Sequence, residues 1–135
     1  MKVERLVINT DGAARGNPGP AAIGATIKDE RGRLIAQISQ RIGIATNNQA
    51  EYRAVIAALK EAIRLGAKKV DISVDSQLVV QQIGGRYRVK NARLKPLFQE
   101  VKRLTERFET FTVAHIPRNQ NTEADSLTNM AYHHR

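Results

Sequence analysis

Apolar and polar positions follow two different periods along this chain, and each period predicts one type of secondary structure. Alternation with period two is typical of strands, and it occurs at residues 3–9, 22–28, 34–44, 69–74 and 110–115. Spacings of three and four residues are typical of helices, and they occur at residues 50–65, 75–84, 93–108 and 122–131. The element order is therefore βββαβααβα. This order predicts an α/β fold in which helices pack on a mixed sheet with an antiparallel hairpin at one edge.

Turn and capping residues mark where these elements begin and end. The segment Asp29-Glu-Arg-Gly32 is a hairpin turn signal between the second and third strands. Thr46-Asn-Asn48 supplies N-cap chemistry for the first helix, and Gly66 is its expected C-cap residue. No internal repeat, low-complexity tract or Pro/Ser-rich linker divides the chain. We therefore expect a single domain over residues 1–135.

Composition narrows the chemistry that this domain can carry. The 135 residues include no cysteine, which excludes disulfides, thiolate metal sites and a cysteine nucleophile. A net charge of +9 and an isoelectric point near 10.4 favour a polyanionic partner, with nucleic acid as the leading candidate. Aromatic residues make up only 4% of the chain, so contacts to nucleic acid must depend more on charge and hydrogen bonds than on stacked bases.

The amino-terminal segment and the hydropathy profile indicate where in the cell the protein is located. Residues 1–5 carry both acidic and basic side chains and lack the uncharged core of a signal peptide. No apolar run approaches the ~20 residues that a membrane-spanning helix needs. We therefore expect a cytoplasmic protein that does not cross a membrane.

Four acidic residues occupy positions where the local pattern favours another residue type. Asp11 and Asp75 each follow a predicted strand at its carboxyl end, the edge of an open α/β sheet where ligand crevices lie. Glu51 shares its helix face with alanines and Val55, so its carboxylate points toward the sheet. Asp125 begins the last helix beside an apolar stripe. Carboxylates that face inward together favour a bound divalent cation, and oxygen ligands without cysteine or histidine suit Mg²⁺ or Mn²⁺.

Each acid alone also fits a local capping role, and this alternative stays open at the level of sequence. Asp11 can start an Asx-turn and Asp75 can be a helix N-cap. The spacings Asn48-x-x-Glu51 and Thr122-x-x-Asp125 both fit capping boxes. Four such acids at the ends of elements that converge on one sheet edge nevertheless favour a shared site.

Ordered motifs that contain these acids resemble those of type 1 ribonuclease H over nearly the whole chain, from Val3 to about Met130. The motifs are Thr10-Asp-Gly-Ala-Ala-Arg-Gly-Asn-Pro-Gly-Pro20, Thr46-Asn-Asn-Gln-Ala-Glu-Tyr52, Val74-Asp-Ser-Gln77 and Asn121-Thr-Glu-Ala-Asp-Ser-Leu127. The resemblance implies a ribonuclease H-like fold with a five-stranded mixed sheet in the order 3-2-1-4-5. It also implies a metal-dependent endoribonuclease that hydrolyses the RNA strand of RNA–DNA hybrids.

By the same resemblance, the four acids are the catalytic and metal-binding residues of a two-metal site. Asp11 is expected to bridge two Mg²⁺ ions, for which Mn²⁺ could substitute. Glu51 and Asp75 complete one ion's site, and Asp125 helps to hold the other. The expected products carry a 5′-phosphate and a 3′-hydroxyl.

The resemblance also assigns substrate contacts to matching positions. Gly12 and the backbone around Ala13 are expected to approach the RNA strand, and Thr46 resembles part of a pocket for a DNA phosphate. Short amide side chains are expected to contact 2′-hydroxyls or minor-groove edges. The expected nucleic-acid contacts in full are Gly12, Ala13, Asn17, Thr46, Asn47, Asn48, Ser76, Gln77, Arg88, Lys90 and Asn91. Helix capping and turn formation remain alternative roles for the Asn, Thr and Gly residues among them.

Two departures from the family pattern stand out. Many relatives carry a loop histidine near the last aspartate, whereas this chain has Arg118, which stays protonated and can stabilise phosphate charge as an auxiliary catalytic group. His115 shares a strand face with apolar residues, which predicts a packed sheet histidine, and His133 and His134 are assigned to a terminal tail. Longer relatives also insert a basic handle after Gly85. Here a short segment, Arg86–Lys95, carries five cations, and it either tracks the DNA backbone or is simply solvated.

Rival functions from other classes remain. One is a binding module for hybrid or duplex RNA without activity, and retention of all four acids speaks against it. Another is an integrase, transposase or resolvase nuclease on the same fold, which would need other acid spacings and extra DNA-binding elements. We expect a monomer with RNA–DNA hybrid as its partner, and double-stranded RNA stays open as a second substrate.

Overall fold

A computed structural model describes residues 4–133 of the chain, so His134 lies outside the described residues. Its strands are β1 (Arg5–Ala14), β2 (Gly19–Lys28), β3 (Leu34–Ala45), β4 (Lys69–Val74) and β5 (Thr110–His115). Its helices are α1 (Asn47–Arg64), α2 (Gln77–Ile83), α3 (Lys95–Thr105) and α4 (Thr122–Ala131), with a 3₁₀ turn, η1, at Arg118–Gln120. The element order βββαβααβα is confirmed, apart from η1, which the sequence pattern did not predict.

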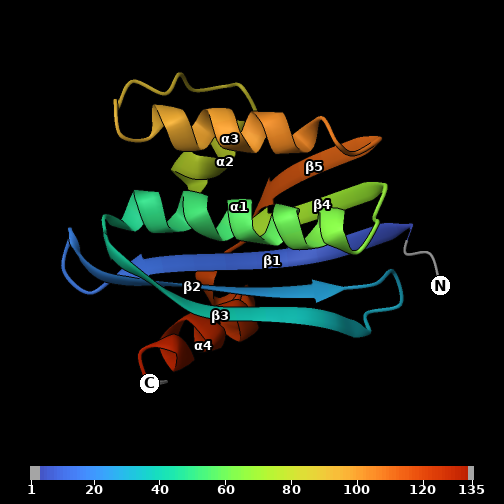
Figure 1. The fold of residues 1–135 in the computed structure, drawn as a ribbon, viewed down its shortest axis with the longest axis horizontal. Coiled ribbons are helices and arrows are strands. Elements are labelled where there is room, and N and C mark those ends of the chain that lie inside the picture. Colours follow the sequence, from blue (N-terminus) through green and yellow to red (C-terminus); the bar gives the residue numbers. More distant parts are fainter. Residues whose placement is uncertain (1–3, 134–135) are drawn as a thin grey trace.

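The five strands form one mixed sheet in the order β3-β2-β1-β4-β5. β1 pairs antiparallel with β2, and β2 pairs antiparallel with β3. β1 pairs in parallel with β4, and β4 pairs in parallel with β5 (Figure 1). The predicted strand order is therefore confirmed. The parallel pair β1 and β4 occupies the centre of the sheet, and both strands end at the same edge.

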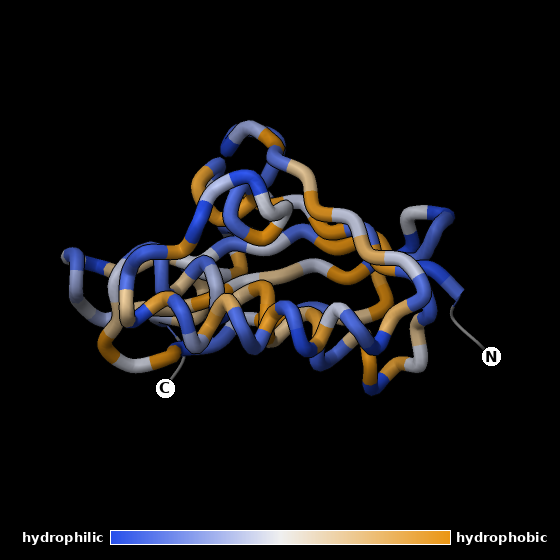
Figure 2. The backbone as a smooth tube through the Cα atoms, turned by 90° about the horizontal axis from the view of Figure 1, so that it is seen from above, coloured by the Kyte–Doolittle hydropathy of each residue, from blue (hydrophilic) through white to orange (hydrophobic). Residues whose placement is uncertain are grey.

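Helices cover both faces of this sheet. α1, α2 and α3 lie on one side, whereas α4 lies on the other and packs against β1, β2 and β3 (Figure 1). The main core forms between α1 and the inner strands, where the largest fully buried side chains include Tyr52, Leu59, Ile8 and Ile72. Apolar stretches run through the middle of the molecule, and the turns at its rim are largely hydrophilic (Figure 2). No helix within residues 4–133 is both long and apolar enough to cross a bilayer.

Two glycines let the helices approach the sheet closely. A Cβ atom on Gly12 would lie 2.3 Å from the carbonyl oxygen of Ala50 in α1. A Cβ atom on Gly24 would lie 2.3 Å from the carbonyl oxygen of Ala124 in α4. Both distances are far below van der Waals contact, so only glycine allows this packing. The residues that follow, Glu51 and Asp125, are thereby held near the centre of the sheet.

The observed boundaries of several elements differ from the predicted ones. β1 continues five residues past the predicted end at Asn9, because residues 7–14 pair with β2 along the whole hairpin. α1 begins at Asn47 rather than Ala50. α3 is shorter than predicted, since its pattern of apolar residues continues into the flanking turns that also pack on the core.

Candidate active site

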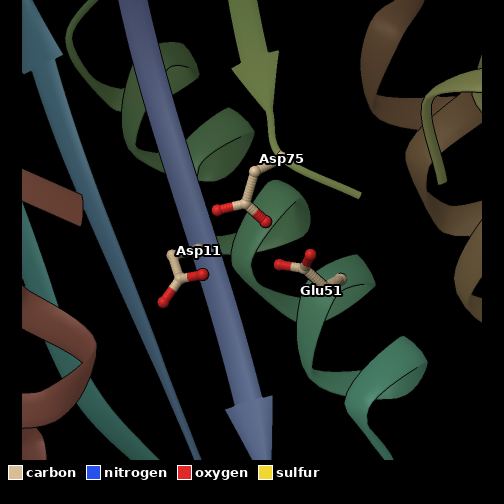
Figure 3. Close-up of side chains that lie close together, drawn as sticks. All are labelled: Asp11, Glu51 and Asp75. Carbon is tan, nitrogen blue, oxygen red and sulfur yellow. The ribbon is translucent and has the colours of Figure 1, made fainter. Parts of the chain in front are cut away.

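Three acidic side chains from different elements meet at the edge of the sheet (Figure 3). Asp11 lies in β1, Asp75 directly follows β4, and Glu51 lies in the first turns of α1. Because Thr10 pairs with Val74 in the parallel register, the next residues, Asp11 within β1 and Asp75 just after β4, lie side by side. One carboxylate oxygen from each of the three acids lies within 4.8 Å of the others. This spacing allows all three to bind one cation.

Burial and mutual repulsion make this cluster costly to ionise without a cation. Asp11 is 4% exposed and Glu51 is 7% exposed. Burial raises the pKa of Glu51 to about 9, and the neighbouring charges of Asp75 and Asp11 add to the effect. Burial likewise raises the pKa of Asp11 to about 6, with a smaller contribution from the charges of Asp75 and Asp125. A divalent cation would favour the ionised form of each group.

The hydrogen bonds of the cluster fix one carboxylate and leave another without a partner. The main-chain N–H of Gly12 donates to Oε1 of Glu51 at 2.7 Å, which orients this carboxylate toward β1. Oδ2 of Asp11 is buried, yet it has no hydrogen-bond partner within residues 4–133. A buried carboxylate oxygen is normally satisfied, and a metal ion is one partner that would satisfy it. The donor set, three carboxylates without sulfur or imidazole, suits Mg²⁺ or Mn²⁺.

The local capping roles that the sequence left open for the acids are taken by other residues. Thr46 is the N-cap of α1 and forms a capping box with Gln49, so Glu51 is not part of one. Ser76, not Asp75, caps α2 by accepting from the N–H of Val79. Asp11 lies within the β1 ladder and starts no turn. Helix ends and turns therefore do not explain the acidic cluster.

A buried amide, Asn121, connects the parts of this site. It is 1% exposed, and its Nδ2 donates to the main-chain oxygen of Thr10 at 2.8 Å and to Oδ2 of Asp75 at 3.0 Å. Its Oδ1 accepts from Nδ2 of Asn9 at 3.1 Å. The sequence placed Asn121 in a motif but gave it no role. The sequence shows only an Asn before the last helix; its burial and the absence of a side-chain cap at the N-cap of α4 appear only in the structure.

Comparisons with known proteins decide the family of this chain. A family model described as "Reverse transcriptase-like" matches residues 9–131. The crystal structure of RNase H1 from the halophilic archaeon Halobacterium salinarum superposes with a TM-score of 0.93 at 40% identity, covering 96% of this chain and 98% of that chain. The chain belongs to the type 1 ribonuclease H family.

Two further relatives show how much of each protein's length the similarity covers. The bifunctional protein Rv2228c of Mycobacterium tuberculosis is 43% identical over 128 residues, which cover 94% of this chain. The match spans only 35% of the mycobacterial protein's length. LC11-RNase H1, solved in complex with an RNA/DNA hybrid, superposes with a TM-score of 0.89 at 44% identity and covers 93% of this chain and 95% of that chain.

The fourth acid expected from the ribonuclease H resemblance, Asp125, lies close to the cluster but outside the group of three. It sits half-buried in the first turn of α4, where Nδ2 of Asn129 donates to its Oδ2 at 3.4 Å. Its charge contributes to the raised pKa of Asp11, after the larger effect of burial. The exposed guanidinium of Arg118, in η1, acts on the same pKa in the opposite direction. Both predicted residues thus lie within electrostatic range of Asp11.

The nucleic-acid contacts expected from the ribonuclease H resemblance fall into two groups. The first surrounds a cavity of about 200 Å³ at the amino-terminal end of α1, lined by Asn17, Thr46, Asn48, Gln49, Asn91, Arg93 and Leu94. Several of these side chains also hold the local backbone. Oδ1 of Asn17 accepts from the N–H of Asn47 at 3.1 Å, and Oδ1 of Asn47 accepts from the N–H of Ala14 at 2.8 Å. The capping and turn roles that the sequence left open are therefore realised here beside a polar cavity.

The second group lies around α2 and the segment that replaces the handle of longer ribonucleases H. Gln77, Arg88 and Lys90 are exposed, and Ser76 is engaged as the cap of α2. Arg86, Arg88 and Lys95 help to line a larger cavity of about 640 Å³ beside α3. Gly12, which is buried, and Ala13, which is half-buried, continue β1 from Asp11.

One prediction about histidine is wrong. His115 ends β5 and is exposed, whereas Phe111 and Val113 on the same face are half-buried. The strand's last residue extends past the edge of the core, so sharing a face with apolar residues does not bury it. His133 lies exposed in the turn after α4. No histidine within residues 4–133 belongs to the acidic cluster.

Proposed function

We propose that this protein is a metal-dependent endoribonuclease that hydrolyses the RNA strand of RNA–DNA hybrids and leaves 5′-phosphate and 3′-hydroxyl ends. The observation that carries the proposal is the convergence of Asp11, Glu51 and Asp75 within 4.8 Å, with one buried carboxylate oxygen left unpartnered within the described chain. Family membership and the hybrid complex of LC11-RNase H1 support the substrate class.

The residues present fit two Mg²⁺ ions, with Mn²⁺ as a substitute. Asp11, Glu51 and Asp75 would hold one ion, and Asp11 with the nearby Asp125 would hold the other. When bound, such ions supply an activated water and neutralise charge on the phosphate and the departing oxygen.

The chain's own groups prepare this site. The N–H of Gly12 holds the Glu51 carboxylate in place, and the amide of Asn121 holds that of Asp75. Burial of Asp11 excludes water from the side of the site that faces the core. Arg118 brings an exposed positive charge into range of Asp11, and its planar fork suits a phosphate oxygen of the substrate.

Duplex binding would use the polar and basic surfaces on the α1 side of the acids. We infer that the cavity lined by Thr46, Asn48 and Arg93 accepts a phosphate of the DNA strand, because it combines hydroxyl, amide and guanidinium donors. The five cations of segment 86–95 would follow the same strand, since all five are exposed. The net charge of +9 adds a general attraction to the duplex.

Cleavage assays on matched duplexes test this function. Purified protein should cut the RNA of an RNA–DNA hybrid with Mg²⁺ or Mn²⁺, and EDTA should stop the reaction; an RNA–RNA duplex shows whether the activity extends to double-stranded RNA. Asp11→Asn and Asp75→Asn should each abolish cleavage, because the amide keeps the shape but removes charge that holds the ions. Glu30→Gln, an equal loss of charge at an exposed turn position, is the control. Binding of the hybrid without cleavage would instead support the inactive binding module.

A further inference from the structure

Tyr132, directly after α4, ties the end of this helix to the hairpin that carries Asp11. Its hydroxyl lies 3.1 Å from the carbonyl oxygen of Ala13 and 2.9 Å from that of Pro20, so its proton is shared between the two. Ala13 belongs to β1, two residues beyond Asp11. The contact therefore fixes the path of the chain that leaves the acidic site.

Arg15 is stacked on the ring of the same tyrosine. Its guanidinium carbon lies 3.8 Å from the centroid of the Tyr132 ring. Stacking of this kind fixes the plane of a guanidinium while leaving its N–H groups free to donate sideways. Arg15 is exposed and forms no ion pair with a carboxylate within residues 4–133. Its charge is oriented but not neutralised.

A second guanidinium is anchored beside the first. Nε of Arg41, in β3, donates to the carbonyl oxygen of Ala131 at 2.8 Å, and its Nη2 donates to that of Tyr132. These bonds hold Arg41 at the carboxyl end of α4. Its Nη1 makes no hydrogen bond to the described residues, and Arg41 likewise forms no ion pair with a carboxylate there.

Both arginines border one cavity of about 400 Å³. Its lining consists of Arg15, Pro20, Ala21, Arg41, Gly43, Ile44 and Tyr132. Within the described residues no acidic side chain contributes to this lining. Two oriented guanidiniums at an opening without a carboxylate form a site for a planar or tetrahedral oxyanion.

This cavity lies on the other face of the sheet from the cavity at the start of α1, and its wall residue Tyr132 bonds to Ala13, two residues beyond Asp11. α4, whose end forms it, covers the face opposite α1 (Figure 1). The pKa of the Tyr132 hydroxyl is raised by burial; Arg15 lowers it, and the charge of Asp11 raises it further. Asp11 is therefore within electrostatic range of the ring on which Arg15 is stacked.

We propose that Arg15 and Arg41 bind a backbone phosphate of the RNA strand, on the α4 side of the acids. The inference rests on the proposed function, in which ions held by Asp11 act on a phosphate of the RNA strand, so that the RNA strand passes Asp11. Arg15 continues this same stretch of chain, so the strand that passes Asp11 is the one whose next phosphates come within its reach. The site differs from the cavity at Thr46, which faces the DNA strand.

Salt-dependent binding of a hybrid by the non-cleaving Asp11→Asn protein tests the proposal at a fixed Mg²⁺ concentration. Adding Arg15→Gln should weaken binding several-fold and reduce the slope of log K against log salt by roughly 0.9, the value for one lost phosphate contact. Arg107→Gln is the matched control, an exposed arginine between α3 and β5, next to the start of the parallel strands rather than their carboxyl ends. Arg15→Lys should recover only part of the affinity, because lysine keeps the charge but not the planar stack.

Single neutral methylphosphonate linkages then identify the strand. One such linkage in the RNA strand near the cleavage position should weaken binding by the Asp11→Asn protein but leave the Asp11→Asn/Arg15→Gln protein unaffected. The proposal is overturned if the salt slope with Arg15→Gln equals that of the Arg107→Gln control, or if only linkages in the DNA strand show this coupling. Failure of the wild-type protein to cleave hybrid would overturn the proposed activity alone, since the Arg15-dependent slope is measured without cleavage.

Discussion

The side-chain amide of Asn121 donates a hydrogen bond to the carboxylate of Asp75 at 3.0 Å, across 46 positions of sequence. The same amide nitrogen donates to the main chain of Thr10, the residue before Asp11. The main-chain oxygen of Asn121 in turn accepts from the N–H of Asp125. One buried residue thus fixes the relative positions of three of the four acids.

Removal of this amide should weaken metal binding as well as the fold. Asn121→Ala leaves the buried oxygen of Thr10 unsatisfied and should lower the free energy of unfolding by about 1–3 kcal/mol. It also frees the Asp75 carboxylate, and loss of a group that orients a metal ligand typically costs 10–100-fold in affinity or activity. Mn²⁺ titration calorimetry and steady-state kinetics, with denaturant unfolding, should show weaker Mn²⁺ binding and a lower kcat at nearly constant KM.

Asn119→Ala provides the control for this prediction. Asn119 is exposed in η1, two residues away, and should leave stability and Mn²⁺ affinity unchanged. If Asn121→Ala loses stability but keeps wild-type Mn²⁺ affinity and kcat, then Asn121 serves the fold alone.

Stability of the metal-free protein should fall as pH rises. Burial raises the pKa of Asp11 from 3.8 to about 6 and that of Glu51 from 4.5 to about 9, with help from neighbouring acids. Between the unfolded and folded pKa values the folded state binds more protons than the unfolded state. The contribution of these two carboxyl groups to the free energy of unfolding is therefore complete at about pH 4 and is lost toward pH 9. Each such carboxyl contributes a slope of up to about 1.4 kcal/mol per pH unit.

Thermal melts in EDTA and in Mg²⁺ check this dependence. In EDTA, Tm should decrease from pH 5 to pH 8, and Glu51→Gln should flatten the decrease because the amide does not titrate. Added Mg²⁺ should raise Tm more at pH 8 than at pH 5, since the ion binds the ionised carboxylates. A Tm in EDTA that rises over this interval for the wild type but not for Glu51→Gln would contradict the assigned direction.

Arg118 should contribute to turnover by charge rather than by proton transfer. Arg118→Ala should reduce kcat strongly, and Arg118→Lys should restore only part of it, because lysine lacks the planar fork. The loss of kcat in Arg118→Ala should persist across the working pH range, because the guanidinium stays protonated. His115→Ala should change neither stability nor kcat by much, since His115 is exposed at the end of β5. Loss of an ionisation near pH 6.5 in the pH–rate profile of His115→Ala, with a silent Arg118→Ala, would reverse these roles.

The basic segment after α2 should act on substrate affinity. Replacing Arg86, Arg88 and Lys90 with glutamine should raise KM and flatten the slope of log K against log salt by roughly 0.9 per lost phosphate contact. Turnover at saturating substrate should barely change, because these exposed side chains lie outside the acidic cluster. An unchanged salt slope would show that the segment is only solvated.

The sequence by itself determined the element order, the strand order through the family resemblance, and the meeting of Asp11 with Asp75. The element order and the meeting of the two aspartates depend on short-range information, since period two or three to four reports which face of an element is buried. The strand order followed from the family resemblance instead. Two neighbouring parallel strands with aspartates at matching positions toward their carboxyl ends bring these carboxylates together at one edge of the sheet. The inward direction of Glu51 followed from its helical face in the same way.

Only the tertiary structure decided which of several local roles each polar residue takes. The sequence offered capping patterns at Glu51, Asp75 and Asp125. In the structure Thr46 caps α1, Ser76 caps α2, and the N-cap residue of α4, Asn121, makes no side-chain cap.

The same holds for partners that are distant in sequence. Asn121 reaches Thr10, and Tyr132 reaches Ala13, only because α4 packs closely on β2 at Gly24, which brings together residues more than 100 positions apart. Local periodicity contains no information about such contacts, since they depend on how α4 and the sheet pack against each other. The exposure of His115 was decided likewise by where the core ends rather than by the face it shares.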